Sequence, residues 1–284
     1  MSKLEPMQVG VMFWTGGNLS MEVAPDQLAG VVRKFGVRCG QLGLHADADL
    51  GAHAQAAWRQ ALLANDFTLV TVFLGFIGEN YADIPTAART VGYAPRATRR
   101  EREKRTYEAS DFAKALGITS VAAHIGVIPE KHSDKDWAEI RSLVRRVCNY
   151  CKANNQTFCL ETGQESAATL DKFLADVERS NLRINFDPAN MVLYGSGDPI
   201  EALEELRKWI ITVHCKDGTW PQQKEKFGKE TPLGAGDVDI PRFVSKLREI
   251  RYGGPLVIER EISGEAYQED VLRAVKLLED LRKV

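Results

Sequence analysis

Short apolar runs alternate with longer amphipathic segments along the whole chain. Apolar runs of strand length indicate buried β-strands, and apolar residues that recur every three or four positions indicate helices with one buried face. The runs that we expect to form strands are 7–14, 38–44, 67–74, 118–126, 156–161, 182–187, 211–216 and 255–261. The segments that we expect to form helices are 24–36, 49–65, 96–117, 133–154, 166–180, 198–209, 238–250 and 265–284.

This alternation predicts the fold class. Strands separated by helices form right-handed βαβ units, and such units build a parallel sheet. Eight of them in 284 residues suit a (β/α)8 TIM barrel of the α/β class. A doubly wound open sheet is the alternative, but it usually has fewer strands. No linker or low-complexity tract interrupts the pattern, so we expect one domain spanning residues 1–284.

The two ends of the expected strands differ in chemistry. In a TIM barrel the reactive residues lie where the strands end and the βα loops begin. Those places read FWTGGN, GLHAD, GFIGEN, HIGVIPE, ETGQES, DPAN, HCKDGTW and EREISG, and nearly every one carries a His, Asp, Glu, Asn or Lys. The opposite ends, such as KFGVR, ALGITS and IRYGGP, hold mostly glycine and basic turn residues. One mouth of the barrel is therefore expected to carry the chemistry.

Glu161, Asp187, His214 and Glu259 lie at the ends of the last four expected strands. Consecutive strands of a barrel are neighbours, so these side chains should converge. Three adjacent carboxylates repel one another and raise each other's pKa values unless a cation lies among them. Three carboxylates and one imidazole suit Mn²⁺, Mg²⁺, Co²⁺ or Fe²⁺, with Zn²⁺ as a further option. We predict a divalent-metal site.

Other roles compete for these residues. A single acid at a strand end more often caps a helix or pairs with a cation, and Asp187 before Pro188 suits a helix N-cap. Four residues in register are harder to explain by capping. Glu261 shares a strand face with Glu259 and is an alternative ligand, although Glu259 lies closer to the apolar run. Cys215 should face away from His214, so no cysteine ligand is expected.

Charge and cysteine content narrow the class of protein. The chain has 37 Lys+Arg against 39 Asp+Glu and a net charge of -2, which argues against nucleic acid as a partner. Its five cysteines form no CxxC pair, and no segment resembles a signal peptide or membrane anchor. We expect a cytoplasmic protein that binds a small molecule and no membrane.

Six short segments carry a family resemblance: AAHIG, LETG, FDPAN, VHCKD, PLGAGDVD and LVIERE. They resemble the sugar phosphate isomerase/epimerase family, which has the xylose isomerase-like TIM barrel and includes relatives of ketose 3-epimerases and endonuclease IV. The resemblance runs from about Val9 to the last helix. It implies that Glu161, Asp187, His214 and Glu259 bind one divalent metal, Mn²⁺ being the first expectation. Similar proteins often form homo-oligomers, which is an expectation here too.

The resemblance also implies a reaction on a carbohydrate. Glu161 and Glu259 would act as acid and base in the isomerisation or epimerisation of a sugar, sugar phosphate or polyol derivative. One removes the proton α to the carbonyl and the other returns a proton, while the metal stabilises the enediolate. The alternative is a lyase, dehydratase or hydrolase-type enzyme that uses the same site on a 3-keto-glycoside or an inosose.

Three observations bear on further alternatives. Many ketose epimerases have a histidine shortly after the strand-six Asp, but Asn190 lies there in this chain. This departure argues against a free-ketose 3-epimerase. Five histidines and a charge of -2 weigh against a DNA-repair endonuclease. A non-catalytic sugar-binding relative is the remaining alternative, and inactivating either glutamate in an active parent would exclude it.

The rest of the expected mouth supplies candidates for substrate contacts. These are His124, Lys216, Asn190, Glu261 and Trp220, whereas His45 is a weaker candidate. The simpler expectations are a core histidine for His124 and a surface lysine for Lys216. We expect segment 218–236 to lack secondary structure and to form a lid, with Trp220 and Phe227 over the substrate. Segment 78–100 is similarly long, and we expect its Tyr81, Tyr93 and Arg96 to be candidates for substrate contacts.

Overall fold

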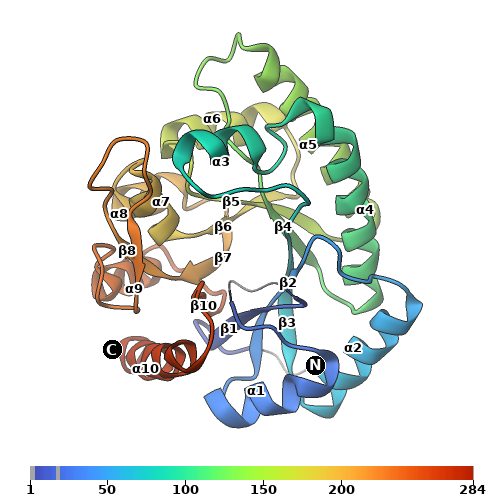
Figure 1. The fold of residues 1–284 in the computed structure, drawn as a ribbon, viewed down its shortest axis with the longest axis vertical. Coiled ribbons are helices and arrows are strands. Elements are labelled where there is room, and N and C mark those ends of the chain that lie inside the picture. The colour runs from blue at the N-terminus through green and yellow to red at the C-terminus, as the bar shows by residue number, and fades with distance from the viewer. Residues whose placement is uncertain (1–3, 17–19, 284) are drawn as a thin grey trace.

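The computed structural model describes residues 4–16 and 20–283 and contains a closed barrel of parallel strands (Figure 1). Around the barrel the strand order is β1-β10-β7-β6-β5-β4-β3-β2. These strands are β1 (Val9–Trp14), β2 (Cys39–Leu44), β3 (Thr68–Leu74), β4 (Ser120–His124), β5 (Thr157–Glu161), β6 (Leu182–Phe186), β7 (Ile210–Cys215) and β10 (Leu256–Ile258). The predicted TIM barrel is confirmed.

The helices surround the strands (Figure 1). They are α1 (Leu28–Phe35), α2 (Ala52–Ala64), α3 (Ile84–Thr90), α4 (Arg99–Ala115), α5 (Lys135–Ala153), α6 (Ala167–Val177), α7 (Pro188–Tyr194), α8 (Pro199–Leu206), α9 (Ile240–Glu249) and α10 (Glu265–Leu281), with short 3₁₀ turns at Pro25–Gln27 and Arg96–Thr98. Within the described ranges, no helix combines the length and the apolar character that crossing a membrane requires.

Two connecting segments are more regular than the sequence indicated. The prediction that segment 218–236 has no secondary structure is wrong, because β8 (Asp217–Thr219) pairs antiparallel with β9 (Lys229–Thr231). Segment 78–100 contains α3. The pattern missed these elements because they are short and bury few side chains of their own.

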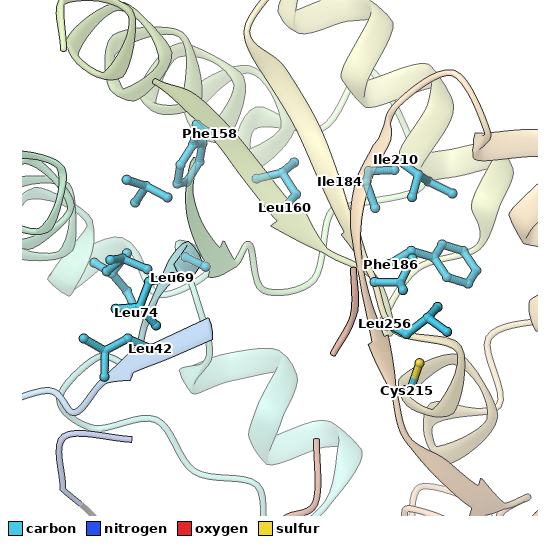
Figure 2. Packing of buried hydrophobic residues seen from close by; sticks show 14 of the residues in the cluster. Leu42, Leu69, Leu74, Phe158, Leu160, Ile184, Phe186, Ile210, Cys215 and Leu256 are labelled. Carbon is cyan, nitrogen blue, oxygen red and sulfur yellow. The ribbon is translucent and has the colours of Figure 1, made fainter. Parts of the chain in front are cut away.

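Alternation of side chains along the strands forms two apolar layers. One face of each strand contributes to a large cluster between the barrel and the helices (Figure 2), which includes Phe158, Leu160, Phe186, Cys215 and Leu256. The other face points into the barrel, where a small cluster contains Met12, Phe73, Ala122, Cys159 and Val257. Period-two alternation then places residues such as Glu161, Asp187 and Glu259 on the inner face above this floor.

Candidate metal centre

The structure brings Glu161, Asp187, His214 and Glu259 together at the carboxyl ends of β5, β6, β7 and β10. All four residues are buried, and one ligand atom from each lies within 4.8 Å of those of the other three. His214 Nδ1 lies 2.7 Å from Glu161 Oε1, 3.1 Å from Glu259 Oε2 and 3.7 Å from Asp187 Oδ2. Such a group has the size of a shell around one divalent ion, whose ligands lie about 2.0–2.6 Å away.

The orientation of His214 depends on two residues that the sequence did not single out. Gln41 donates through Nε2 to Asn185 Oδ1 (2.9 Å), which turns Gln41 Oε1 toward His214 Nε2 (3.0 Å). Asn185 in turn donates to Glu161 Oε1 (3.3 Å). Asn185 Nδ2 also lies 3.2 Å from His214 Nε2. With a hydrogen on Nε2, His214 donates to Gln41 Oε1, and Nδ1 faces the three carboxylates. Partners of this kind fix the tautomer of a metal-binding histidine.

The two carboxylate oxygens of Asp187 have different surroundings. Oδ1 accepts the backbone N–H of Asn190 (3.0 Å) and so caps α7, as the capping alternative predicted. Oδ2 is buried and has no hydrogen-bond partner among the described residues, whereas His214 Nδ1 faces only carboxylate oxygens, the nearest being Glu161 Oε1 at 2.7 Å. Burying polar atoms without partners costs about 1–3 kcal/mol for each group, and more when the group is charged. The capping and metal-binding roles are therefore compatible, because they use different oxygens.

The charges around this cluster shift its pKa values in opposite directions. Burial raises the pKa of Glu161, but the neighbouring His124 and His214 outweigh burial and hold it at about 2. Burial lowers the pKa of His214, but Glu259 and Glu161 outweigh burial and raise it well above its usual value. Burial keeps the pKa of Asp187 raised despite Lys216. A proton on His214 thus supplies positive charge where a bound cation would, and cation binding would displace it.

The residues present fit a divalent cation. The donor set is three carboxylates and one imidazole, the buried Asp187 Oδ2 has no hydrogen-bond partner among the described residues, and Gln41 holds the imidazole from its other side. Cysteine is not among the donors: Cys215 packs against the helices, and burial raises the pKa of the Cys159 thiol inside the barrel to about 11. This geometry supports the predicted site and favours Glu259 over Glu261 as the fourth member.

Four of the predicted substrate contacts lie beside this cluster. His124 Nε2 lies 2.7 Å from Glu161 Oε2, and its ring packs near Tyr81 at 5.9 Å between centroids. Lys216 is buried, and its Nζ lies 3.2 Å from Glu259 Oε2 and 2.9 Å from Glu261 Oε2. Lys216 also donates to Asn190 Oδ1 (3.4 Å). The expectation of a surface lysine is wrong, because Lys216 is enclosed by acidic groups.

The remaining candidates lie apart from the cluster. Trp220 is 39% exposed, and no hydrogen bond, ion pair or aromatic contact among the described residues joins it to the three acids and the histidine. The His45 side chain is 43% exposed and pairs with Asp47. Tyr93 is wholly buried and its hydroxyl meets Thr106 Oγ1 at 2.6 Å, so the prediction that it contacts substrate is wrong. Arg96 is paired with Asp136 (2.8 Å).

Together, the fold and the cluster define a TIM barrel with a buried acidic and imidazole site at the carboxyl ends of its strands. The chain belongs to the xylose isomerase-like TIM barrel family, whose model matches residues 30–280. No curated protein sequence matches it.

Solved structures resemble the chain over nearly its whole length. A xylose isomerase domain protein from Planctomyces limnophilus is 38% identical, with 98% of each chain covered and a TM-score of 0.90. A D-allulose 3-epimerase from Methylomonas sp., in complex with D-allulose, is 16% identical, with 99% of each chain covered and a TM-score of 0.71. A xylose isomerase-like TIM barrel protein from Mycobacterium smegmatis, in complex with magnesium, is 15% identical, with 98% of each chain covered and a TM-score of 0.66. The two distant structures share the fold.

Proposed function

We propose that this protein is a divalent-metal-dependent isomerase or epimerase of a sugar, sugar phosphate or polyol derivative. The observation that carries the proposal is the convergence of Glu161, Asp187 and Glu259 on the Nδ1 side of His214. Membership of the xylose isomerase-like family supports this reaction class. Among distant neighbours, one is a D-allulose 3-epimerase and another holds magnesium, which is consistent with a sugar substrate and a metal. Mn²⁺ remains the first expectation, with Mg²⁺, Co²⁺, Fe²⁺ or Zn²⁺ as alternatives.

The four clustered residues would hold the ion. When bound, it supplies a positive charge that polarises a substrate carbonyl and its neighbouring hydroxyl. The chain itself supplies the rest of the chemistry: proton transfer, orientation of the carboxylates and burial from water.

Glu161 and Glu259 are the proposed proton carriers. One carboxylate takes the proton α to the carbonyl, so the C–H bond breaks and its electron pair stays on the substrate. The other residue, as a carboxylic acid, gives a proton to the opposite face or to the adjacent carbon. His124 orients Glu161 through its 2.7 Å contact, and Lys216 orients Glu259 at 3.2 Å. Fixed partners of this kind hold an acid and a base in reach of substrate.

A lyase or dehydratase acting on a 3-keto-glycoside or an inosose is the second candidate. The observation that favours it is Asn190, which lies on α7 with its Oδ1 3.4 Å from Lys216 Nζ. An amide there can bind a substrate oxygen, but it cannot carry a proton as an imidazole does. The first half of this reaction, removal of the α-proton, uses the same glutamates.

A metal-supplemented panel of ketoses, ketose phosphates, inososes and 3-keto-glycosides tests the proposal. We expect turnover that stops with EDTA and returns with Mn²⁺, and deuterium from D₂O in the product at the carbon that lost its proton. Glu161→Gln and Glu259→Gln should each lower kcat at least about 100-fold. Glu101→Gln, on the exposed face of α4, is the matched control.

Product identity separates the two candidates. Loss of water or of an aglycone, seen by NMR, would favour the lyase. Turnover that persists after complete metal removal, or full activity of both glutamine variants, would contradict the proposal.

A further inference from the structure

The long connection after β7 is tied at its base by one buried carboxylate. Asp217 Oδ1 accepts the backbone N–H groups of Gly218 (2.9 Å) and Val238 (3.2 Å). Its Oδ2 accepts those of Gly234 (2.9 Å) and Gly236 (3.0 Å). Four donors on one carboxylate hold both ends of segment 217–238 at the end of β7. The contact at Gly236 is close, since a Cβ there would lie 2.3 Å from Asp217 Oδ1.

The hairpin within this segment packs against α7, the helix that begins after Asp187. Gly218 pairs with Glu230 in the antiparallel register of β8 and β9. A Cβ on Gly218 would lie 2.8 Å from the Leu193 side chain, and the backbone N–H of Gly228 donates to Leu193 O (2.8 Å). The hairpin is therefore packed against α7. It is not the free lid that the length of the segment suggested.

The hairpin carries Glu230 to the segment that follows β10. Both carboxylate oxygens of Glu230 accept the backbone N–H of Glu261, at 2.9 and 3.3 Å. Glu230 Oε1 also lies 2.8 Å from Arg260 Nη1, and Arg260 is paired with Asp270 of α10 (3.0 Å). The Glu230 side chain is only 14% exposed, so water screens these contacts little.

Strand β10 ends before Glu259 and Glu261, so the ladder of the barrel does not hold the backbone of both residues. The strand stops at Ile258, and the backbone N–H of Glu259 donates to Cys215 O at 3.2 Å. One residue further on, the chain leaves the barrel. Glu230 contacts Arg260 and Glu261 directly after the last ladder bond, together with Ser20, whose hydroxyl donates to Arg260 O at 3.0 Å.

We propose that Glu230 is a positioning residue for the candidate metal site, and that segment 217–238 is a fixed brace for Glu259. This inference rests on the proposed function only in naming Glu259 as a ligand. Glu230 acts through the backbone of residues 260–261, and within the described ranges no hydrogen bond or ion pair joins it to Glu161, Asp187, His214 or Glu259. Its removal loosens that backbone and weakens the hold of Glu259 on a cation, as loss of a supporting group around a metal site generally does.

The first test needs no metal. Hydrogen–deuterium exchange is followed for peptides covering residues 256–264 in the metal-free protein and in Glu230→Ala, Glu230→Gln and Lys229→Ala. We expect at least fivefold faster exchange in Glu230→Ala. Glu230→Gln keeps an oxygen acceptor and should lie closer to the parent. Lys229→Ala, an exposed neighbour on β9, should match the parent.

The second test is calorimetric titration of the same proteins with Mn²⁺ alone. We expect about tenfold weaker binding by Glu230→Ala, partial recovery in Glu230→Gln and no change in Lys229→Ala. Circular dichroism and the unfolding temperature in EDTA check that each variant is folded, and Glu230→Gln preserves the test if the alanine variant is not. Parent-like exchange of 256–264 in the folded variants would overturn the inference, as would parent-like Mn²⁺ affinity. A parent protein that binds no Mn²⁺ would instead overturn the proposed function. The exchange data, which need no metal, would still test whether Glu230 holds the backbone of residues 260–261.

Discussion

Gln41 Oε1 lies 3.0 Å from His214 Nε2 across the barrel interior, although the two residues are 173 positions apart in the chain. This contact holds the imidazole with Nδ1 toward Glu161 and Glu259. Removing it frees the ring to turn and leaves a buried N–H without an acceptor.

We therefore expect Gln41→Leu to weaken Mn²⁺ binding by about 10- to 100-fold. Titration calorimetry on the folded variant measures the effect. Thr71→Val is the control inside the same barrel, because Thr71 Oγ1 is buried and has no hydrogen-bond partner in the described ranges. Wild-type affinity in Gln41→Leu would contradict the role assigned to this contact.

Metal binding should stabilise the folded protein. A ligand that binds only the native state adds about 2.7 kcal/mol at 100 times its dissociation constant. For a protein of this size that corresponds to a rise of about 4–8 °C in unfolding temperature. Differential scanning fluorimetry with Mn²⁺ against EDTA measures it. Glu259→Gln should lose most of this rise, and an equal rise in that variant would remove Glu259 from the set of ligands.

Glu165 predicts a dependence of stability on pH. Its two carboxylate oxygens are buried without a hydrogen-bond partner among the described residues, and burial raises its pKa from 4.5 to about 8. Because the folded pKa is the higher one, the folded state binds the proton more tightly. The stability contributed by this group is complete below about pH 4.5 and is lost as the pH rises toward 8.

Glutamine imitates the neutral acid and does not titrate, so Glu165→Gln should remove this loss. Relative to the parent, the free energy of unfolding of the variant should rise by about 2–3 kcal/mol between pH 6 and pH 9. Urea unfolding at several pH values measures the difference, with Glu101→Gln as an exposed control. A difference that stays constant with pH would show that Glu165 is already ionised at pH 6.

Asp217 should stabilise the protein independently of any metal. Asn at this position keeps the shape but replaces one oxygen by an amide that must face two of the backbone N–H donors. We expect Asp217→Asn to lower the free energy of unfolding in EDTA by about 2–4 kcal/mol. Urea unfolding checks it against Asp280→Asn, an exposed acid on α10. A loss below about 0.5 kcal/mol would contradict the capping role.

Much of the fold follows from local pattern. The eight apolar runs predicted the eight barrel strands, because period-two burial between two apolar layers leaves a strong signal. The same alternation placed Glu161, Asp187, His214 and Glu259 on one face at four strand ends. Their convergence needs only barrel closure, which makes consecutive strands neighbours.

Other features escaped sequence reasoning because they depend on long-range geometry. Tyr93 looked like a loop aromatic available to substrate, but its hydroxyl is buried against Thr106. The hairpin β8–β9 has no alternation of apolar residues in its sequence, and it packs against α7. Gln41 lies on a strand distant in the chain, and its meeting with His214 depends on the register in which the barrel closes.

The sequence by itself determined the class of fold, the face that carries the chemistry and the residue types gathered there, because burial period and strand-end position are local properties. Only the tertiary structure decided which imidazole nitrogen faces the acids, that Lys216 is enclosed by carboxylates, and that Glu230 reaches the backbone of Glu261. These three features depend on contacts between residues far apart in the chain. Such contacts form only when the barrel closes and the loops pack against it.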